Sequence, residues 1–354
     1  MNQYSKILVT GGCGFIGSNF IVKNIDNNSS HILNYDKLSY AANPNNLISV
    51  ENFKSQYTFI KGDICNYNNI KKTILEYTPE VIVHFAAESH VDRSISNPMQ
   101  FVESNVIGTV NLIRASNECI NSNKLSKNFK FIHISTDEVY GSLDNTGLFT
   151  ENSPYKPSSP YSASKAAADH FVNSWVKTFN FPAIMVHASN NFGPFQFPEK
   201  LIPHMILNCL NHKSLPIYGD GSNIRDWLYV DDFCNAINLV IKKGIIGETY
   251  NVGSNNEKTN LEIVHLICDL LDNLKPSKKL KSYADLISFV KDRPGHDFRY
   301  AIDSSKITNK LGFKIENSFP FNMEQTIKWY LENNEWTKNI LSGDYKLTRL
   351  GLDK

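Results

Sequence analysis

The sequence predicts an α/β protein built on a doubly wound parallel sheet. Short apolar runs rich in β-branched residues alternate with helical patterns through the first half of the chain, and these runs lack the polar–apolar alternation of a half-solvated sheet. A glycine-rich turn follows the first run and opens a helix. Together these observations indicate a Rossmann-type sheet covered by helices on both faces, followed by a smaller, loop-rich C-terminal substrate lobe.

Two long helices are expected among the strands of the first half. Asn97-Pro98 is a suitable N-terminal boundary for a helix over residues 99–119. A second helix is expected over residues 161–179, with an apolar stripe made of Phe171, Val172, Trp175 and Phe179. Core packing would explain most of that stripe, and pairing of the long helices with those of a second copy is the alternative for part of it. The strands are expected at residues 6–10, 32–36, 57–61, 81–85, 129–135 and 183–187.

Segments marked by proline and glycine follow residue 188, mixed with helices near residues 231–243, 259–272 and 320–333. We therefore expect residues 1–188 to form mainly the sheet domain and residues 189–354 mainly the lobe, with some crossing of the chain between them. Ligands of open α/β sheets bind at the carboxyl ends of the strands. A lobe at that edge would close over the ligand and contribute substrate contacts.

The composition is that of an ordinary globular protein, with 354 residues, 41% hydrophobic and 20% charged. A formal net charge of +1 gives no electrostatic reason to expect binding to nucleic acid or to a membrane surface. The six cysteines are scattered without metal-ligand spacing, so buried free thiols and no metal site are expected. The sequence lacks a secretory leader pattern and an apolar run of about 18 residues, which predicts a cytoplasmic protein.

The first strand runs into Gly11, Gly14 and Gly17, a G-x-x-G-x-x-G turn that opens a helix. Without Cβ atoms the backbone can approach a pyrophosphate, which would then bind the free N–H groups at the helix N-terminus. Asp36 ends the second strand about 20 residues further on, where a carboxylate binds adenosine ribose hydroxyls and repels a 2′-phosphate. NAD is therefore favoured over NADP as the cofactor, although the charge of Lys37 would weaken that preference.

Further cofactor contacts are expected where other strands end. Gly62, Asp63 and Ile64 follow the third strand and would border the adenine, whereas a helix N-cap is the alternative role for Asp63. The fourth strand is followed by small residues at positions 86 and 87, which leave room for the cofactor backbone. The residues expected at the cofactor are Gly11, Gly14, Phe15, Ile16, Gly17, Asp36, Lys37, Asp63, Ile64, Phe85, Ala86, Ala87, Tyr161 and Lys165.

Five side chains suited to proton transfer lie within residues 136–165. Tyr161 and Lys165 are four residues apart, so both face the same side of a helix, and the ammonium would lower the pKa of the phenol and make it a usable base. Asp137 and Glu138 add an acid and a base, which implies a second reaction, most simply elimination of water. Adjacent acids commonly form a solvated turn, but this pair directly follows an apolar strand on the expected catalytic side.

These residues resemble the extended short-chain dehydrogenase/reductases, and specifically the nucleotide-sugar 4,6-dehydratases of the dTDP-glucose type. The resemblance covers nearly the whole chain, and its most specific element is the triplet Thr136-Asp137-Glu138. The matching segments are the glycine turn and residues 36–41, 84–93, 135–141, 161–165, 190–194, 197–203, 224–230 and 292–297.

The resemblance implies conversion of dTDP-glucose to dTDP-4-keto-6-deoxy-glucose plus water by internal hydride transfer through bound NAD, in deoxysugar (rhamnose-type) biosynthesis. Tyr161 would take the proton of the sugar 4-hydroxyl, with Lys165 holding the phenolate and Thr136 hydrogen-bonding the developing ketone. Glu138 would remove the proton of carbon 5. Asp137, kept protonated by burial and by Glu138, would protonate the departing 6-hydroxyl. A homodimer through a helix bundle is also implied.

Substrate contacts are expected mainly from the family pattern. Arg225 and Arg293 suit a diphosphate because a guanidinium presents several donors in a fixed fork, with a surface ion pair as the alternative. His84 is expected to be a packed structural histidine, and Arg93 borders the same strand. The expected substrate contacts are Ser89, Thr136, Asn190, Lys200, Leu201, Pro216, Tyr218, Arg225, Asn260, Arg293 and Tyr300.

Three other functions remain open from the sequence. UDP-glucose is an alternative substrate, since thymine and uracil differ by one methyl group, worth about 1–3 kcal/mol in an apolar pocket. A nucleotide-sugar 4-epimerase would share the fold, NAD and the tyrosine–lysine pair, but it needs no acid–base pair at carbons 5 and 6. A non-catalytic NAD-binding protein is the third, although such proteins usually lose the tyrosine or the lysine.

Overall fold

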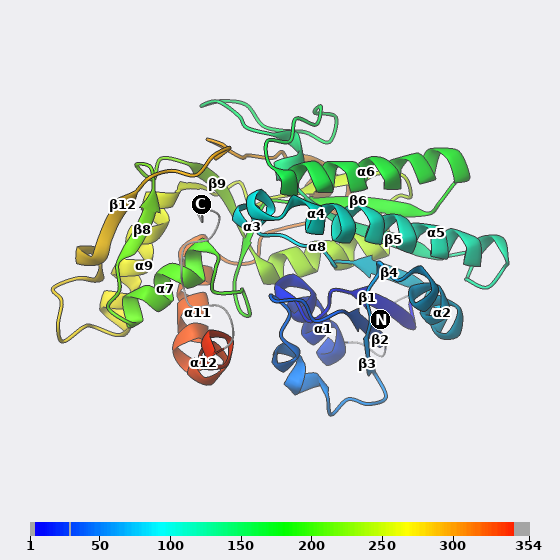
Figure 1. Ribbon diagram of the computed structural model, residues 1–354, viewed down its shortest axis with the longest axis horizontal. Coiled ribbons are helices and arrows are strands. Elements are labelled where there is room, and N and C mark those ends of the chain that lie inside the picture. The colour runs from blue at the N-terminus through cyan, green and yellow to red at the C-terminus, as the bar shows by residue number, and fades with distance from the viewer. Residues whose placement is uncertain (1–3, 28–29, 343–354) are drawn as a thin grey trace.

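The computed structural model describes residues 4–27 and 30–342, which form two lobes that lie side by side (Figure 1). Seven strands form one sheet in the order β10-β6-β5-β4-β1-β2-β3, and every neighbouring pair is parallel. The doubly wound parallel sheet is confirmed, and the six expected strands are all present. Their bounds are β1 Lys6–Thr10, β2 His31–Asp36, β3 Tyr57–Lys61, β4 Val81–His84, β5 Lys130–Thr136 and β6 Ala183–Ala188, with β10 Thr249–Val252 added at the edge.

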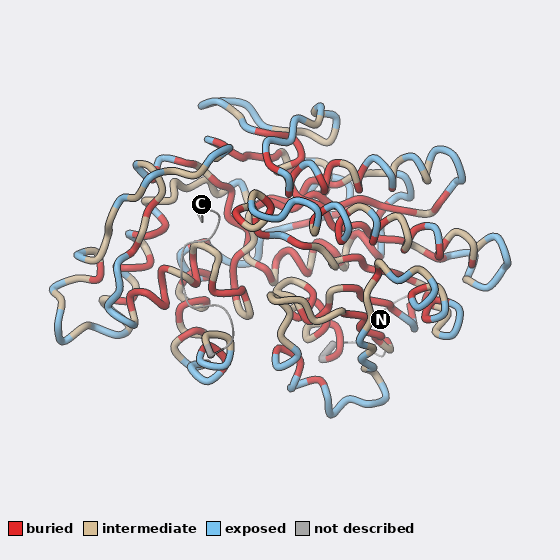
Figure 2. The backbone as a smooth tube through the Cα atoms, in the orientation of Figure 1, coloured by how far each residue is buried: buried red, intermediate tan, exposed pale blue. Residues whose placement is uncertain are grey.

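Helices cover both faces of this sheet, because successive strand residues point to opposite faces and both sets are apolar. Ile7 and Val9 of β1 pack into the core that includes Phe20, whereas Leu8 packs into a different core with Leu112. The central strands are accordingly buried along their length (Figure 2). The first core is covered by α1 Phe15–Asn27, α8 Val230–Lys243 and α10 Ser305–Leu311, and the second by α2 Tyr67–Tyr77, α5 Gly108–Asn121 and α6 Pro160–Phe179.

The second lobe has its own apolar core, which includes Met205, Ile263 and Ile327. Two small sheets flank it, with strand orders β11-β9-β7 and β12-β8. The helices are α7 Leu201–Leu210, α9 Asn260–Leu274, α11 Phe319–Glu332 and α12 Asn334–Ser342, and the strands are β7 Asn190–Phe192, β8 Leu215–Tyr218, β9 Ile224–Tyr229, β11 Glu257–Thr259 and β12 Ile287–Val290. Short helical turns lie elsewhere along the chain, namely η1 Pro44–Val50, α3 Val91–Ser96, η3 Asp137–Tyr140 and η4 Tyr283–Leu286.

The chain crosses between the lobes after residue 188. Strand β10 pairs with β6 in the large sheet, and α8 contributes Phe233 and Ile237 to the core that includes β1. Residues 230–252 therefore pack with the N-terminal half of the chain, although they follow the first strands of the second lobe in sequence. All six cysteines are free, and all but Cys65 are buried. Within the part of the chain that the structure describes, none of the helices combines the length and the apolar composition that a membrane span requires.

The helix expected over residues 99–119 is interrupted. It consists of α4 Pro98–Phe101, a wider π-type turn over Val102–Ile107 and then α5. A π-type turn inserts a residue and re-aims the side chains around it, often at functional sites. Here Asn105 accepts a hydrogen bond from the backbone N–H of Glu88 at 2.8 Å and donates to Ser164 of α6 at 2.8 Å. The sequence analysis did not predict this turn.

The apolar stripe on α6 is only partly a core feature. Val172 is fully buried and Trp175 packs against the core, but Phe171 and Phe179 are 40% and 51% exposed. The prediction that core packing explains most of the stripe is therefore wrong for these two phenylalanines, because they lie on the outer side of the helix.

Candidate active site

The glycine turn between β1 and α1 closely approaches the segment that follows β4. A Cβ atom added at Gly11, which has a φ of +72°, would lie 2.6 Å from the Cα atom of Ala86, and one added at Gly17 would lie 2.5 Å from the carbonyl oxygen of Gly11. Both distances are too short for a side chain, so glycine is required. The strand order reverses between β1 and β4, and that crevice is where open α/β sheets bind ligands.

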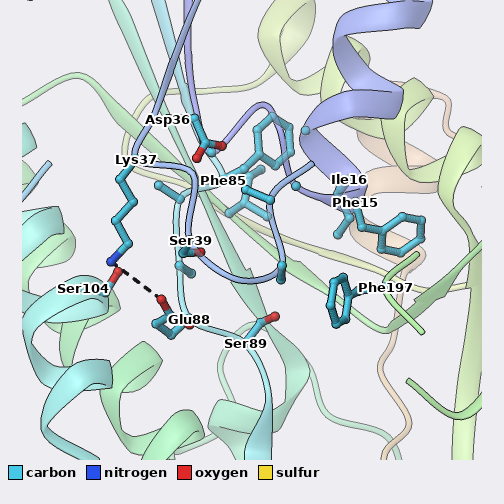
Figure 3. A pocket seen from close by; sticks show the side chains of 18 of the residues that line it. Phe15, Ile16, Asp36, Lys37, Ser39, Phe85, Glu88, Ser89, Ser104 and Phe197 are labelled. Carbon is cyan, nitrogen blue, oxygen red and sulfur yellow. Dashed lines mark ion pairs between the residues drawn. The ribbon is translucent and has the colours of Figure 1, made fainter. Parts of the chain in front are cut away.

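A cavity of about 210 Å³, the cofactor cavity below, occupies this crevice (Figure 3). All residues that the sequence predicted for the cofactor line it, namely Gly11, Gly14, Phe15, Ile16, Gly17, Asp36, Lys37, Asp63, Ile64, Phe85, Ala86, Ala87, Tyr161 and Lys165. Gly62, which directly precedes Asp63 and was expected with it beside the adenine, lines the cavity as well. The sequence analysis missed Tyr35, Ser39, Ala41, Ala42, Glu88, Ser89, Ser104, Ile134, Ser135, Gln196, Phe197, Glu199 and Lys200 as lining residues of this cavity. Most of these come from segments without a glycine pattern, and only the tertiary structure brings them together.

Asp36 lies at the end of β2 in the wall of the cofactor cavity. Its carboxylate accepts hydrogen bonds from the backbone N–H groups of Cys13 at 2.9 Å and Leu38 at 2.7 Å. Burial raises the pKa of Asp36, and the two backbone hydrogen bonds oppose that shift. The ammonium of Lys37 lies 3.6 Å from the carboxylate of Glu88, so its charge is partly balanced within the cavity (Figure 3).

Asp63 does not cap a helix. Its carboxylate accepts a hydrogen bond from the backbone N–H of Cys65 at 2.8 Å. The N-cap of α2 is Asn66, which accepts from the backbone N–H of Asn69 at 3.1 Å. The alternative role of Asp63 as an N-cap is therefore wrong, because the helix begins further along the chain than the sequence suggested.

The start of α6 is fixed by a capping box, which places Tyr161 in the first turn. The hydroxyl of Ser159 accepts from the backbone N–H of Ser162 at 3.1 Å, and the hydroxyl of Ser162 accepts from the backbone N–H of Ser159 at 3.0 Å. Pro160 occupies the first helical position, where no N–H is needed. The phenol of Tyr161 is thus carried on a rigid turn at the wall of the cofactor cavity.

Lys165 lies one turn after Tyr161 and is buried. Its ammonium donates to the carbonyl oxygen of Ile134 in β5 at 2.8 Å, and burial lowers its pKa to about 8. The pKa of Tyr161 is raised, first by burial and then by Glu138, while a hydrogen bond with Thr136 opposes the shift. The expectation of a lowered phenol pKa is therefore wrong for the net shift, because desolvation of the phenolate dominates.

The carboxyl pair follows β5 directly, within the single turn η3. Asp137 is 1% exposed, and its Oδ2 atom has no hydrogen-bond partner among the described residues. Burial and then the charge of Glu138 raise the pKa of Asp137 well above its usual range, in the direction that the sequence predicted. The hydroxyl of Thr136 donates to the Oδ1 atom of Asp137 at 3.3 Å. The alternative that the pair lies in a solvated turn is thus wrong for Asp137, because this residue is buried inside the protein.

A second cavity, of about 460 Å³, lies beside the first and is called the substrate cavity below. It shares Ser89, Glu199 and Lys200 with the cofactor cavity, and Glu138 is part of its wall. Of the expected substrate residues it contains Ser89, Asn190, Lys200, Leu201, Pro216, Tyr218, Arg225, Asn260, Arg293 and Tyr300. Thr136 lines neither cavity. Tyr161 lines the cofactor cavity, and Glu138 lines the substrate cavity.

The two arginines of the substrate cavity are not surface ion pairs of the ordinary kind. Arg225 is 5% exposed, donates to the carbonyl oxygen of Asp297 at 2.9 Å and stacks 4.3 Å above the ring of Tyr300. Arg293 pairs with Asp92 at 2.9 Å across the cavity wall, with 16% of its side chain exposed. The alternative prediction of a surface ion pair is therefore wrong for Arg225. Arg293 does form an ion pair, but that pair is largely buried.

The sequence analysis missed a cluster at the junction of the two cavities. Tyr40 donates to one carboxylate oxygen of Glu199 at 2.8 Å, and Arg93 donates to the other at 3.1 Å while stacking 3.7 Å above the Tyr40 ring. His90 lies 3.9 Å from the same carboxylate. Glu199 directly precedes the predicted Lys200 within the matching segment 197–203, and this placement was its sequence signal.

His84 is the packed histidine that the sequence predicted. It is 1% exposed, and its two ring nitrogens lie 2.7 Å from the hydroxyl of Thr10 and 2.9 Å from that of Thr109. Within residues 4–27 and 30–342, no group of three or more His, Cys, Asp or Glu side chains is arranged to hold a metal ion.

Comparisons with known proteins agree with this geometry. A family model described as GDP-mannose 4,6 dehydratase matches residues 8–326. The dTDP-glucose 4,6-dehydratase of Neisseria meningitidis serogroup B is 49% identical over 354 residues, which cover 99% of each chain. Its length and residue order thus correspond to this chain almost throughout.

Solved structures show the same architecture. The dTDP-glucose 4,6-dehydratase of Streptomyces venezuelae, crystallised with NAD bound, has a TM-score of 0.86 at 38% identity and covers 95% of this chain and 99% of its own. The UDP-glucose 4-epimerase of Thermotoga maritima has a TM-score of 0.82 at 25% identity and covers 93% and 99%. Because both enzymes share the fold, the fold alone does not separate dehydration from epimerisation.

Proposed function

This chain belongs to the dTDP-glucose 4,6-dehydratase family, and from that membership we propose that it is an NAD-dependent hydro-lyase that converts dTDP-glucose to dTDP-4-keto-6-deoxy-glucose and water. The observation that carries the proposal is the acidic pair Asp137–Glu138 in the turn η3, in which Glu138 lines the substrate cavity and Asp137 is buried directly before it. Hydride transfer alone would require only Tyr161 and Lys165.

The residues of the cofactor cavity fit NAD. The glycine turn exposes backbone N–H groups at the start of α1, where a pyrophosphate binds favourably. The buried carboxylate of Asp36 suits two ribose hydroxyls and would repel a 2′-phosphate, and Glu88 balances the charge of Lys37. When bound, NAD would accept a hydride from carbon 4 of the sugar and return it to carbon 6.

We assign the first proton transfer to Tyr161. Its phenol borders the cofactor cavity beside Ser89 and Lys200, which also border the substrate cavity. Burial makes loss of the phenol proton costly, so the ammonium of Lys165 one turn away is needed to stabilise the phenolate. Thr136 forms a hydrogen bond with the phenol of Tyr161, and it would bind the developing ketone.

Asp137 and Glu138 have different surroundings, and from these we assign the acid and the base of the elimination step. The pKa of Asp137 is shifted furthest upward, so its protonated form is favoured and it serves as the acid. Burial also raises the pKa of Glu138, but the positive charges of Arg293, Lys200 and Arg225 oppose that shift and favour its carboxylate. Glu138 would therefore remove the proton of carbon 5.

The same three cations suit the diphosphate of the substrate. Arg225 is held by backbone carbonyls and by the Tyr300 ring, so its guanidinium is preorganised in the cavity. We therefore propose that residues 1–188 supply mainly the cofactor site and residues 189–354 mainly the nucleotide-sugar site. The exceptions from the first part, which line the substrate cavity, are Ser89, His90, Val91, Asp92 and Glu138. Those from the second part, which line the cofactor cavity, are Gln196, Phe197, Glu199 and Lys200.

The thymine base is proposed on the strength of the relatives. UDP-glucose lacks the methyl group of the base, which an apolar pocket distinguishes by about 10–200-fold at most, and it carries a 2′-hydroxyl on its ribose. Turnover of the two substrates measured side by side on purified protein tests the choice, and equal or greater turnover of UDP-glucose would reverse it.

Isotope incorporation separates dehydration from epimerisation, which the shared fold leaves open. Incubation with dTDP-glucose in deuterated water should place deuterium at carbon 5 of a 4-keto-6-deoxy product, because Glu138 exchanges the proton that it removes. A dTDP-galactose product without deuterium at carbon 5 would establish an epimerase instead. No reduction of bound NAD on addition of any sugar nucleotide would indicate a non-catalytic protein.

We further propose that the protein is a cytoplasmic homodimer. The exposed Phe171 and Phe179 on α6, together with Val102 and Ile107 on the neighbouring π-type turn, offer apolar side chains for pairing with a second copy. Light scattering of the purified protein tests the dimer, and a monomer at micromolar concentration would contradict it.

A further inference from the structure

Helix α6 carries a third ionisable side chain on the face that bears Tyr161 and Lys165. Asp169 follows Lys165 by one helical turn, is 1% exposed and has no role in the mechanism above. A carboxylate this deeply buried is costly unless it is paired or fully hydrogen-bonded. Its position behind the catalytic lysine therefore needs a physical reason.

Three side chains from two strands surround the Asp169 carboxylate. The Nε2 atom of His133 lies 2.9 Å from Oδ1, and Oδ2 accepts from the hydroxyl of Ser135 at 2.8 Å and lies 3.0 Å from Nε2 of His187. His133 and Ser135 are alternate residues of β5, so they point to the same face of the sheet. The residue between them, Ile134, is the one whose carbonyl oxygen binds Lys165.

The electrostatic surroundings of Lys165 are otherwise unfavourable to its charge. Burial lowers its pKa, and Asp169 opposes that shift. His84 and His133 face it from β4 and β5, and burial lowers the pKa of both rings, in His133 to about 4, so both are neutral at pH 7. Among these groups only Asp169 supplies a compensating negative charge.

Two phenols contact His187, which is one of the partners of Asp169. The hydroxyl of Tyr155 lies 3.1 Å from Nε2 of His187, and that of Tyr140 lies 2.6 Å from Nδ1 of the same ring. Burial raises the pKa of both tyrosines above the usual range, so both phenols stay neutral. The cluster thus offers hydrogen bonds that hold a carboxylate in place beside a buried ammonium.

We propose that Asp169 is a positioning residue whose carboxylate keeps Lys165 in its ammonium form and so sets the pH range over which Tyr161 can act. The inference rests on the proposed function, because it assumes that the ammonium of Lys165 supports the phenolate. A purely structural role, in which Asp169 only ties α6 to β5, is the competing explanation.

The pH dependence of hydride transfer distinguishes the two. In Asp169→Asn the negative charge is lost, so the pKa values of Lys165 and of Tyr161 should both fall, and both limbs of the rate profile should move to lower pH. The readout is the rate at which bound NAD is reduced when dTDP-glucose is added, measured across pH. A one-unit shift would lower the rate on the basic limb about tenfold relative to the wild type, with less loss near neutral pH.

Tyr155→Phe is the matched control, because it removes a hydroxyl from the same buried cluster without removing a charge. It should lower stability while leaving both limbs where the wild type has them. If Asp169→Asn lowers the rate by the same factor at every pH, or if Tyr155→Phe shifts the limbs equally, Asp169 is only structural and the proposal is overturned.

Asp169→Glu keeps the proposal testable if Asp169→Asn does not fold. This variant retains the charge, so its limbs should stay close to those of the wild type even if its maximal rate is reduced. Limbs displaced to lower pH in Asp169→Glu would contradict the proposal. A wild-type protein that never reduces NAD would instead contradict the proposed function, so the two failures are distinguishable.

Discussion

Asp137 and Glu138 are adjacent in the chain, but their surroundings push them toward different protonation states. Asp137 is buried with an unpartnered carboxyl oxygen, whereas Glu138 faces Arg225, Arg293 and Lys200 in the substrate cavity. Two carboxyls whose pKa values are separated in this way can serve as acid and base in the same turnover. The chemistry of elimination is therefore decided at the scale of single residues.

Removing both carboxyls should separate the two halves of the reaction. Glu138→Gln combined with Asp137→Asn should still reduce bound NAD when dTDP-glucose is added, because Tyr161 and Lys165 remain. Formation of the 4-keto-6-deoxy product should fall by at least about 10²-fold, the usual contribution of general acid–base catalysis. Absorbance of the reduced cofactor and chromatography of the product measure the two steps separately.

The adjacent pair Asp231–Asp232 offers a control for this double variant. It follows strand β9 after one intervening residue, but it lines neither cavity. Asp231→Asn with Asp232→Asn should keep product formation close to normal in the folded protein. Normal dehydration by the Glu138/Asp137 double variant would show that the assigned roles are wrong.

The raised pKa of Asp137 also predicts how stability depends on pH. In the unfolded chain the pKa of this carboxyl is 3.8, so above that pH folding takes up a proton at Asp137. The contribution of Asp137 to stability therefore declines as the pH rises toward the folded-state pKa. Asp137→Asn removes this dependence. The melting temperature of the variant relative to wild type should therefore increase between about pH 5 and pH 8. A constant difference across that range would mean that Asp137 is ionised in the folded protein.

At the scale of elements, the beginning of α6 determines where Tyr161 lies. The capping box at Ser159 and Ser162 fixes the first turn, and Pro160 fits it without a lost hydrogen bond. The π-type turn before α5 acts similarly, since it lets Asn105 bind both the backbone of Glu88 and the α6 residue Ser164. Local backbone geometry thus aligns two walls of the cofactor cavity.

Loss of the α6 cap should therefore affect activity as well as stability. Ser159→Ala removes one acceptor at the helix start and should cost about 0.5–2 kcal/mol of folding free energy. It should also lower the rate of NAD reduction several-fold, because the turn that carries Tyr161 becomes less ordered. Denaturant unfolding and the NAD reduction assay measure the two effects.

Ser282→Ala is the comparison for that variant, because Ser282 forms the capping box of η4 in the second lobe. It should lower stability without slowing NAD reduction. Equal slowing by both variants would mean that the effect of Ser159 is one of general stability.

At the scale of the whole molecule, hydrogen bonds join the lobes around the cofactor cavity. Glu199 of the second lobe binds Tyr40 and Arg93 of the first, and its side chain is only 2% exposed. Asn19 of α1 also joins the two parts of the chain, since it donates to the carbonyl oxygen of Pro194 at 2.9 Å. A reaction that returns its hydride needs no exchange of NAD, so contacts that retain the cofactor are expected.

We therefore expect the Tyr40–Glu199 contact to slow release of NAD. Tyr40 itself lines neither cavity, although its neighbours Ser39 and Ala41 line the cofactor cavity. Tyr40→Phe should accelerate NAD release roughly tenfold, since a hydrogen bond to a charged group is worth about 1.5–3 kcal/mol. The NAD retained by the purified protein after repeated gel filtration measures the effect.

The chain contains a close structural match that serves as the control. Tyr67 donates to Glu118 at 2.5 Å, and Arg114 binds the same carboxylate and stacks 4.4 Å above the Tyr67 ring, outside both cavities. Tyr67→Phe should leave NAD retention unchanged. Equal loss of NAD from both variants would show that the Tyr40 contact has no specific role.

Much of the fold and the site could be predicted because the relevant signals are local. Strand β1, the glycine turn and Asp36 follow one another closely, and each has a composition that few other structures tolerate. The roles of Glu199 and Asp169 could not be predicted in this way. The hydrogen-bond partners of Glu199 lie 106 or more residues away in the chain, and those of Asp169 lie up to 36 residues away. Whether such distant segments meet depends on how the lobes and strands pack.

The sequence by itself determined the parallel sheet, the dinucleotide turn and the residues available for proton transfer, because backbone preference and apolar periodicity act over short stretches of chain. Only the tertiary structure decided the protonation tendencies of Asp137, Tyr161 and Lys165 and the junction at Glu199. Those properties depend on desolvation and on charges brought close from distant segments, and burial of an ionisable group exists only once the chain has packed around it.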